Sequence, residues 1–126
     1  MAGAGAQPKV QSFRDLIVWQ RSIELVVAIY RVTKAFPKDE IYGLTAQMRR
    51  AAVSVPSNIA EGQGRLSTGE FLQFLGNARG SLHELQTQVV IGRKLGYLGE
   101  TQEKQLQDVS LEVDRMLNRL LTSLRS

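Results

Sequence analysis

The chain has 126 residues, of which 43% are hydrophobic, with a net charge of +4 and no cysteine. This length and hydrophobic content suffice for one continuous core, so a second domain is not expected. The lack of cysteine excludes disulfides, thiolate metal ligands and thiol nucleophiles, which is typical of a reducing cytosol. The positive charge permits contact with nucleic acid or another anionic surface without demonstrating it.

No apolar run of about 18 residues is present, and the first residues lack the basic start of a signal peptide. We therefore expect a cytoplasmic protein with no membrane partner. Residues 1–11 are expected to form a flexible N-terminal tail, and residues 12–126 a single four-helix-bundle domain.

The first predicted helix covers residues 12–36. Ser12 is a suitable N-cap, and Pro37 stops the helix because proline cannot continue it. The main apolar stripe is predicted to hold Phe13, Leu16, Ile17, Ile23, Val26, Val27 and Tyr30. Further apolar residues on this helix are Val18, Trp19, Leu25, Ile29 and Val32. One neighbouring face of a bundle cannot cover all of them, so we expect contact with another helix or subunit, Trp19 included.

The second predicted helix covers residues 42–61, and Gly62 is expected to end it in the left-handed conformation. Pro56 lies inside this range, where it lacks a backbone donor and crowds the carbonyl of Ala52. We therefore expect a kink or a break at Pro56. The side chains placed to rebond the freed backbone groups are those of Ser54, Ser57 and Asn58.

The third predicted helix covers residues 67–95, because Ser67-Thr-Gly-Glu70 is a capping-box pattern and Gly96 can end the helix. A heptad seam runs along it from Phe71 through Leu75, Ala78, Leu82, Leu85, Val89 and Gly92. Gly76 and Gly80 each cost about 1 kcal/mol of helix propensity relative to alanine. This cost predicts close approach of a neighbouring helix, either in the same subunit or across a subunit boundary.

The fourth predicted helix covers residues 100–124 and carries its apolar residues on one side. The connections between the four segments are short, which forces consecutive helices to be antiparallel. The sequence therefore predicts an all-α fold, an antiparallel up-down-up-down four-helix bundle.

The side chains that catalysis needs are scarce. His83 is the only histidine, and Gly80 occupies the position where the Glu-x-x-His motif of di-iron bundles requires glutamate. No Gly-x-Ser-x-Gly motif supports a serine nucleophile. We predict that the protein is not an enzyme and has no metal, no cofactor and no small-molecule substrate. A cryptic enzyme stays as a remote alternative that a deep pocket lined by His83 and perturbed carboxylates would revive.

Two interpretations stay open for the basic residues. The segment Gly62-Gln-Gly64-Arg-Leu-Ser67 superficially resembles a phosphate loop, but no strand precedes it and a turn is favoured. The adjacent basic residues on the helices either contact phosphates or only face water and keep the surface soluble. No aromatic residue interleaves with them. The residues to test for phosphate contact are Arg49, Arg50, Arg65, Arg79, Arg93 and Lys94.

Six short motifs follow one another in the order Phe13-Arg-Asp-Leu-Ile-Val-Trp-Gln20, Tyr42-Gly-Leu44, Gln47-Met-Arg-Arg-Ala-Ala52, Ser54-Val-Pro-Ser-Asn-Ile-Ala-Glu-Gly62, Glu70-Phe71 and Leu95-Gly-Tyr-Leu98. Together they resemble the "four helix bundle protein" family, also called the 23S rRNA intervening-sequence protein family. The resemblance implies a small bacterial cytosolic protein, often encoded within an insertion in large-subunit ribosomal RNA genes, with no established enzyme activity.

The resemblance also implies homopentamers of antiparallel four-helix bundles. A distant branch of this family comprises accessory proteins of diversity-generating retroelements, which bind a reverse transcriptase and nucleic acid. The family has no assigned active site, so only a packing and turn role carries over. The residues that take this role are Pro56, Asn58, Glu61 and Gly62.

The sequence and the resemblance together favour a non-enzymatic, homo-oligomeric binding or assembly protein, pentameric by resemblance. Its expected partners are further copies of itself and RNA or a nucleic-acid-binding protein. The alternative is a structural or toxin-like protein–protein interaction module without nucleic-acid binding, whose basic residues only keep it soluble.

Overall fold

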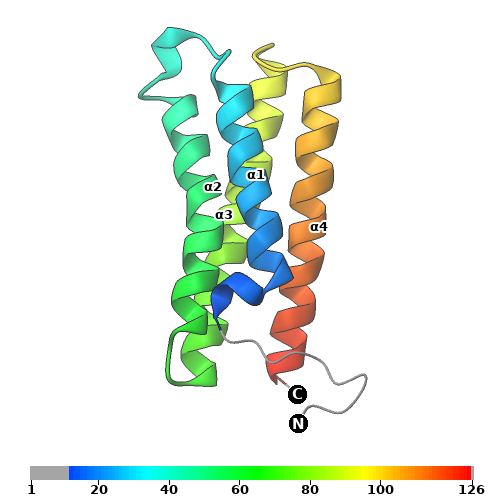
Figure 1. Ribbon diagram of the computed structural model, residues 1–126. Helices are drawn as coiled ribbons and strands as arrows, with labels where there is room; N and C mark the ends of the chain where they lie inside the picture. Colours follow the sequence, from blue (N-terminus) through cyan, green and yellow to red (C-terminus); the bar gives the residue numbers. More distant parts are fainter. Residues whose placement is uncertain (1–11, 126) are drawn as a thin grey trace.

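The computed structural model describes residues 12–125, which form helices and connecting turns without a strand (Figure 1). The elements are η1 (Phe13–Asp15), α1 (Ile17–Thr33), η2 (Lys38–Glu40), α2 (Leu44–Gln63), α3 (Thr68–Lys94) and α4 (Glu100–Arg125). Helix α1 packs against α2 and α4, and α3 packs against the same two helices. Consecutive helices run in opposite directions, which is the predicted all-α four-helix bundle.

The predicted tail, residues 1–11, lies outside the described residues. Within residues 12–125, no helix is both long enough and apolar enough to cross a membrane.

The first helix is shorter at both ends than predicted. Ser12 forms a capping box with Asp15, but this box closes the short turn η1, and Leu16 follows in an extended conformation before α1 begins. At the other end, α1 stops at Thr33, and turn hydrogen bonds then join Ala35 and Phe36 to carbonyls near the helix end. Pro37 therefore begins the next turn and does not itself end the helix.

The stripe of α1 that faces the core is not the predicted one. Val18, Leu25 and Ile29 are at most 6% exposed, whereas Ile17 and Val27 of the predicted stripe are 67% and 41% exposed. The core-facing stripe contains two hydroxyl residues that lower its apparent hydrophobicity, namely Ser22 and Thr33. Their hydroxyls donate to the helix's own carbonyls at Trp19 and Ile29, so both can be buried without an unpaired donor.

Helix α2 runs through Pro56 as one element, so the predicted break does not occur, and the kink stays a prediction. Beside Pro56, the Asn58 side-chain amide donates to the Ser54 carbonyl at 2.8 Å and to the Ser54 hydroxyl at 2.9 Å. The Ser54 hydroxyl also shares a 2.8 Å hydrogen bond with the Ser81 hydroxyl. The Ser54–Ser81 bond connects α2 to α3.

Gly62 has a different role from the predicted one. It is buried inside α2 and does not adopt a positive φ, so it is not a left-handed helix end. A Cβ at this position would lie 2.7 Å from the Phe74 Cβ and 3.0 Å from the Phe71 Cδ1. Glycine is therefore required because α2 and α3 approach closely here, which supports the packing role that the family motif implies.

The end of α3 follows the prediction. Gly96 has a φ of 79° and ends the helix just after Lys94. The Tyr97 amide donates to the Gly92 carbonyl and the Gly96 amide to the Arg93 carbonyl, the two hydrogen bonds of a Schellman motif. At the other end, the Ser67 hydroxyl accepts from the Glu70 amide, as the capping pattern predicts.

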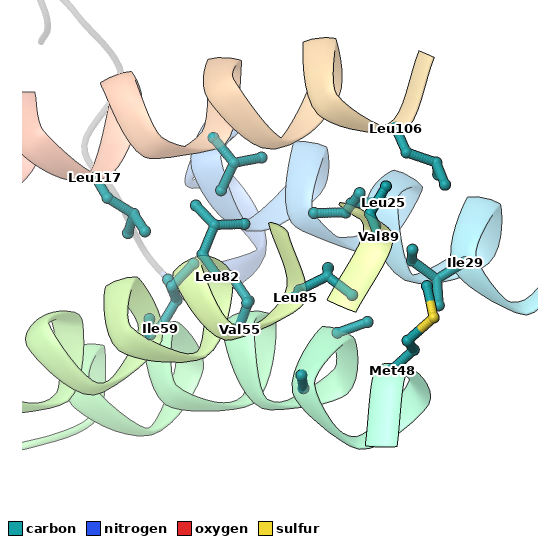
Figure 2. Packing of buried hydrophobic residues seen from close by; sticks show 14 of the residues in the cluster. Leu25, Ile29, Met48, Val55, Ile59, Leu82, Leu85, Val89, Leu106 and Leu117 are labelled. Carbon is teal, nitrogen blue, oxygen red and sulfur yellow. The ribbon is translucent and has the colours of Figure 1, made fainter. Parts of the chain in front are cut away.

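The core is one cluster along the bundle axis, with contributions from all four helices (Figure 2). The predicted seam on α3 is buried from Leu75 to Gly92, and Phe71 at its start is partly buried against the core. Helix α4 adds Leu106, Val113, Leu117 and Leu121, again from the predicted face. The fold therefore leaves the excess apolar surface of α1 on the outside of the bundle.

Candidate functional site

An apolar groove runs between α1 and α2 on the outer surface. It has a volume of about 250 Å³ and is lined by Trp19, Ile23, Val26, Val53, Pro56, Ser57 and Ala60. We call it the α1–α2 groove. Apart from the Ser57 hydroxyl and the Trp19 indole N–H, the side chains of these residues are apolar, so the groove suits an apolar partner surface better than a charged ligand.

The apolar surface continues from the groove along α1. Val27 and Tyr30 are 41% and 39% exposed. The Arg49 guanidinium lies 4.6 Å from the centre of the Tyr30 ring, and its Nε donates to the Thr33 hydroxyl at 2.9 Å. Arg49 is therefore held against α1 by a cation–π contact and a hydrogen bond, which makes it a packing residue between α1 and α2.

Of the predicted helix or subunit contacts, Trp19 lies in the groove, where its ring meets the Phe13 ring edge-on at 5.2 Å. Gly76 and Gly80 lie on the exposed side of α3, and a Cβ at either would meet nothing within 4 Å. Close approach of a helix in the same subunit, one of the two predicted reasons for these glycines, is therefore wrong. Contact across a subunit boundary stays a prediction.

The six basic candidates do not form one patch. Arg49 and Arg50 lie near the start of α2, and Arg93 and Lys94 lie in the last turn of α3, at the same end of the bundle (Figure 1). Arg65 lies at the opposite end, in the connection between α2 and α3, and Arg79 lies within α3 between the two ends.

Acidic side chains neutralise three of these candidates. Arg65 pairs with Glu61 at 3.2 Å, Arg79 with Asp114 at 3.3 Å and Arg93 with Glu103 at 3.9 Å. Arg50 and Lys94 are exposed and make no ion pair with any residue in the range 12–125. They are the two candidates available to a phosphate.

The phosphate-loop interpretation of Arg65 gains no support from the geometry. Besides its ion pair with Glu61, the Arg65 guanidinium lies 4.6 Å from the centre of the Phe74 ring. Gly64 caps the end of α2 with a φ of −80°. Residues 64–67 form an exposed turn between α2 and α3, and a turn is what the sequence favoured.

His83 lies beside one carboxylate, that of Asp114. The His83 Nε2 lies 3.3 Å from Asp114 Oδ1, the same oxygen that Arg79 contacts, and the His83 side chain is 48% exposed. In the part of the chain that the structure describes, no three His, Cys, Asp or Glu side chains gather as metal ligands would.

The connections at one end of the bundle are joined by Glu40 and Tyr97. Glu40 Oε1 accepts from the Leu44 amide at 3.1 Å, and Glu40 Oε2 accepts from the Tyr97 hydroxyl at 2.8 Å. The Leu44 amide, and next the Tyr97 hydroxyl, stabilise the carboxylate and lower the pKa of Glu40. The same bond to Glu40 raises the pKa of Tyr97.

Sequence reasoning missed the exposed aromatic residue at this end. Tyr42 is 93% exposed, although the sequence placed it at the start of a helix. Ile41 and Leu95 are also half or more exposed, at 50% and 54%. The signal that could have found Tyr42 is its place between Pro37 and Gly43, since both residues favour a turn.

Comparison with known proteins gives one family and one fold. The family model described as "23S rRNA-intervening sequence protein" matches residues 14–119. A crystal structure of a protein of unknown function from the S23 ribosomal protein family of Bacteroides thetaiotaomicron is similar, with a TM-score of 0.78 and 21% sequence identity. The match covers 83% of this chain and 98% of that chain. None of the curated proteins matches the chain.

Proposed function

Because the chain belongs to the 23S rRNA-intervening sequence protein family, as its motifs predict, we propose that it is a non-enzymatic binding or assembly protein. In this proposal it forms a homo-oligomer, pentameric by resemblance, and associates with RNA or a ribonucleoprotein.

The α1–α2 groove is the observation that supports self-association. The groove and the adjoining surface of α1 expose apolar side chains of Ile23, Val27 and Val53, each at least 36% exposed. Contiguous apolar surface of this kind is typical of interfaces, and tryptophan is enriched at their centres. The proposed occupant is a second copy of the chain.

A closed ring requires each copy to offer one face to a different face of the next copy. The α1–α2 groove is the first of these faces. The exposed side of α3 with Gly76 and Gly80 is our candidate for the second, because residues without side chains let a helix approach closely.

The single tryptophan of the chain provides a direct test of groove occupancy. Trp19 lies in the groove, so dissociation on dilution should expose it to water and shift its emission to longer wavelength. Emission that stays constant from micromolar to nanomolar concentration, together with a mass of 14.0 kDa by light scattering, would contradict self-association.

Association with RNA is supported by the net charge of +4 and by two basic candidate residues that make no ion pair in the described part of the chain, Arg50 and Lys94. Binding to ribosomal RNA fragments should weaken steeply with added salt, by roughly one power of the salt concentration for each phosphate neutralised. Fluorescence anisotropy of labelled fragments at several salt concentrations measures this slope. Undetectable or salt-insensitive binding would contradict the proposal.

The other basic candidates are engaged within the chain, which favours a second candidate function, a protein–protein interaction module. Arg65, Arg79 and Arg93 already pair with acids of the same chain, and Arg49 is held on Tyr30. If this alternative holds, the protein purified from its native host carries a protein partner and no RNA. Sequencing the RNA and identifying the proteins in the same sample decides between the two functions.

A further inference from the structure

The connection between α1 and α2 presents an aromatic ring to solvent. Tyr42 is 93% exposed and its neighbour Ile41 is 50% exposed. Both residues follow η2 and precede α2, at the end of the bundle where α1 finishes (Figure 1). An uncovered aromatic ring at a loop tip is available for stacking on another flat group.

Hydrogen bonds hold this connection in shape on both sides of Tyr42. The Glu40 amide donates to the Pro37 carbonyl at 2.9 Å, and the Gly43 amide donates to the Glu40 carbonyl at 2.9 Å. The Glu40 side chain then accepts from the Leu44 amide and from the Tyr97 hydroxyl, which fixes the connection to the end of α3. The ring of Tyr42 is therefore presented by an ordered backbone, which lowers the entropy lost when it binds a partner.

Positive charge surrounds Tyr42 in the sequence and at this end of the bundle. Residues 31–50 contain five basic residues and two acidic ones. Lys34 and Lys38 are exposed and make no ion pair within residues 12–125. Of the two acids, Glu40 has both carboxylate oxygens engaged in hydrogen bonds. Glu40 keeps its negative charge and Asp39 is exposed, so residues 31–50 carry a net charge of +3, and the exposed Glu100 lies at the same end of the bundle.

We propose that this end of the bundle binds single-stranded RNA, with the Tyr42 ring stacked on a base and Lys34 and Lys38 beside the phosphates. An exposed aromatic ring flanked by cations is the arrangement with which proteins hold unpaired nucleotides. A protein partner fits less well, because lysine is depleted at the centres of protein interfaces. This inference rests on the RNA association proposed above and assigns it a site.

The test measures binding of fluorescein-labelled oligouridine of about ten nucleotides, a length within the range of single-strand sites. Three substitutions separate stacking from general apolar contact, namely Tyr42→Ala, Tyr42→Leu and Tyr42→Phe. Leu66→Ala is the matched control, because Leu66 is 102% exposed and lies in the connection at the opposite end. Sedimentation of each variant shows that its assembly is that of the wild type.

We expect Tyr42→Ala and Tyr42→Leu to weaken binding about 5- to 100-fold, whereas Tyr42→Phe and Leu66→Ala leave it within about twofold. Lys38→Gln should lower the slope of log affinity against log salt by roughly 0.7. Tight binding by Tyr42→Leu would overturn the stacking contact. If the wild type binds oligouridine and no Tyr42 variant weakens it, the site is wrong and the RNA association stands. If the wild type binds neither oligouridine nor ribosomal RNA fragments, the Tyr42 site and the RNA association are both wrong.

Discussion

The Tyr97 hydroxyl donates a 2.8 Å hydrogen bond to Glu40 Oε2, across 57 positions of the sequence. The Tyr97 ring also packs on the Phe36 ring, with centroids 5.3 Å apart. The bond joins the α1–α2 connection to the α3–α4 connection, so one pair of side chains ties together both turns at this end of the bundle. It shifts the pKa of both partners in opposite directions, down for Glu40 and up for Tyr97.

Tyr97→Phe removes this bond and should change the pH dependence of stability at both extremes. The lowered pKa of Glu40 stabilises the wild type above the ordinary glutamate value of 4.5, and this contribution is lost as pH falls through the folded pKa. The raised pKa of Tyr97 contributes below the ordinary value of 10.0, and this contribution is lost as pH rises through the folded pKa. The difference in the free energy of unfolding between wild type and variant should therefore be largest at pH values between the ordinary pKa of glutamate, 4.5, and that of tyrosine, 10.0.

Urea unfolding of both proteins at a series of pH values measures this difference. The variant should still lose some stability in acid, because the Leu44 amide, the larger cause of the Glu40 shift, remains in place. A difference that stays constant from acid to alkaline pH would show that the hydrogen bond does not form in solution.

Gly62→Ala should destabilise the bundle by about 2 kcal/mol. The new Cβ would lie 2.7 Å from the Phe74 Cβ, a rigid part of α3, so the two helices must move apart. Such overpacking costs up to about 3 kcal/mol, which exceeds the gain of about 1 kcal/mol in helix propensity. The shift of the urea midpoint measures the effect, and an unchanged or higher midpoint would contradict the close approach of α2 and α3.

Gly76→Ala and Gly80→Ala should have the opposite effect on the isolated subunit. Nothing lies within 4 Å of a Cβ at either position, so each alanine should raise the free energy of unfolding by about 1 kcal/mol. The measurement uses a background that cannot assemble, such as Ile23→Glu, so that subunit contacts do not contribute.

The same two substitutions in the assembling protein test the predicted contact across a subunit boundary. If α3 packs on the next copy at these glycines, the added methyl groups should weaken assembly although they stabilise the subunit. Assembly of wild-type strength in the double variant would show that this side of α3 stays exposed in the oligomer.

Asn58→Ala should destabilise the protein by about 1–2 kcal/mol. The substitution removes hydrogen bonds to the Ser54 carbonyl and hydroxyl beside Pro56, and a half-buried hydrogen bond contributes about 1 kcal/mol. Asn77→Ala is the matched control, because Asn77 is exposed on α3 and has no hydrogen-bond partner in the described residues. Equal urea midpoints for both variants would argue against a role for Asn58 in holding α2 at the proline.

Periodicity predicted the bundle and the core faces of α3 and α4, because apolar residues at helical spacing mark the buried side of each helix, although Val90 and Ile91 of α3 and Leu111 of α4 are exposed. It failed for α1, which has two apolar sides. The buried side includes Ser22 and Thr33, whose hydroxyls are satisfied by carbonyls of the same helix, so it appears less hydrophobic in sequence than it is in the structure. The sequence correctly indicated excess apolar surface on α1 with Trp19 as part of it, but it also assigned Val18, Leu25 and Ile29 to that excess, and these three are buried.

The sequence predicted the role of one glycine and missed that of another, because the first role depends on the local chain and the second on a tertiary contact. Gly96 adopts a positive φ at a helix end, a property of the local chain that sequence can indicate. Gly62 is required by Phe71 and Phe74 of the next helix, which only the packed structure brings near. The basic candidates show the same limit, because the acids that pair with Arg79 and Arg93 lie on α4, and only the fold brings α4 against α3.

Sedimentation equilibrium at micromolar concentration tests the central claim, self-association through the α1–α2 groove, most directly. The wild type should have a mass several times 14.0 kDa, five times by resemblance, and Ile23→Glu should have the mass of one chain because it places a charge in the groove. Leu111→Glu, which changes a residue of α4 that is 48% exposed, should assemble like the wild type. A wild-type mass of 14.0 kDa, or an assembled Ile23→Glu variant, would contradict the claim.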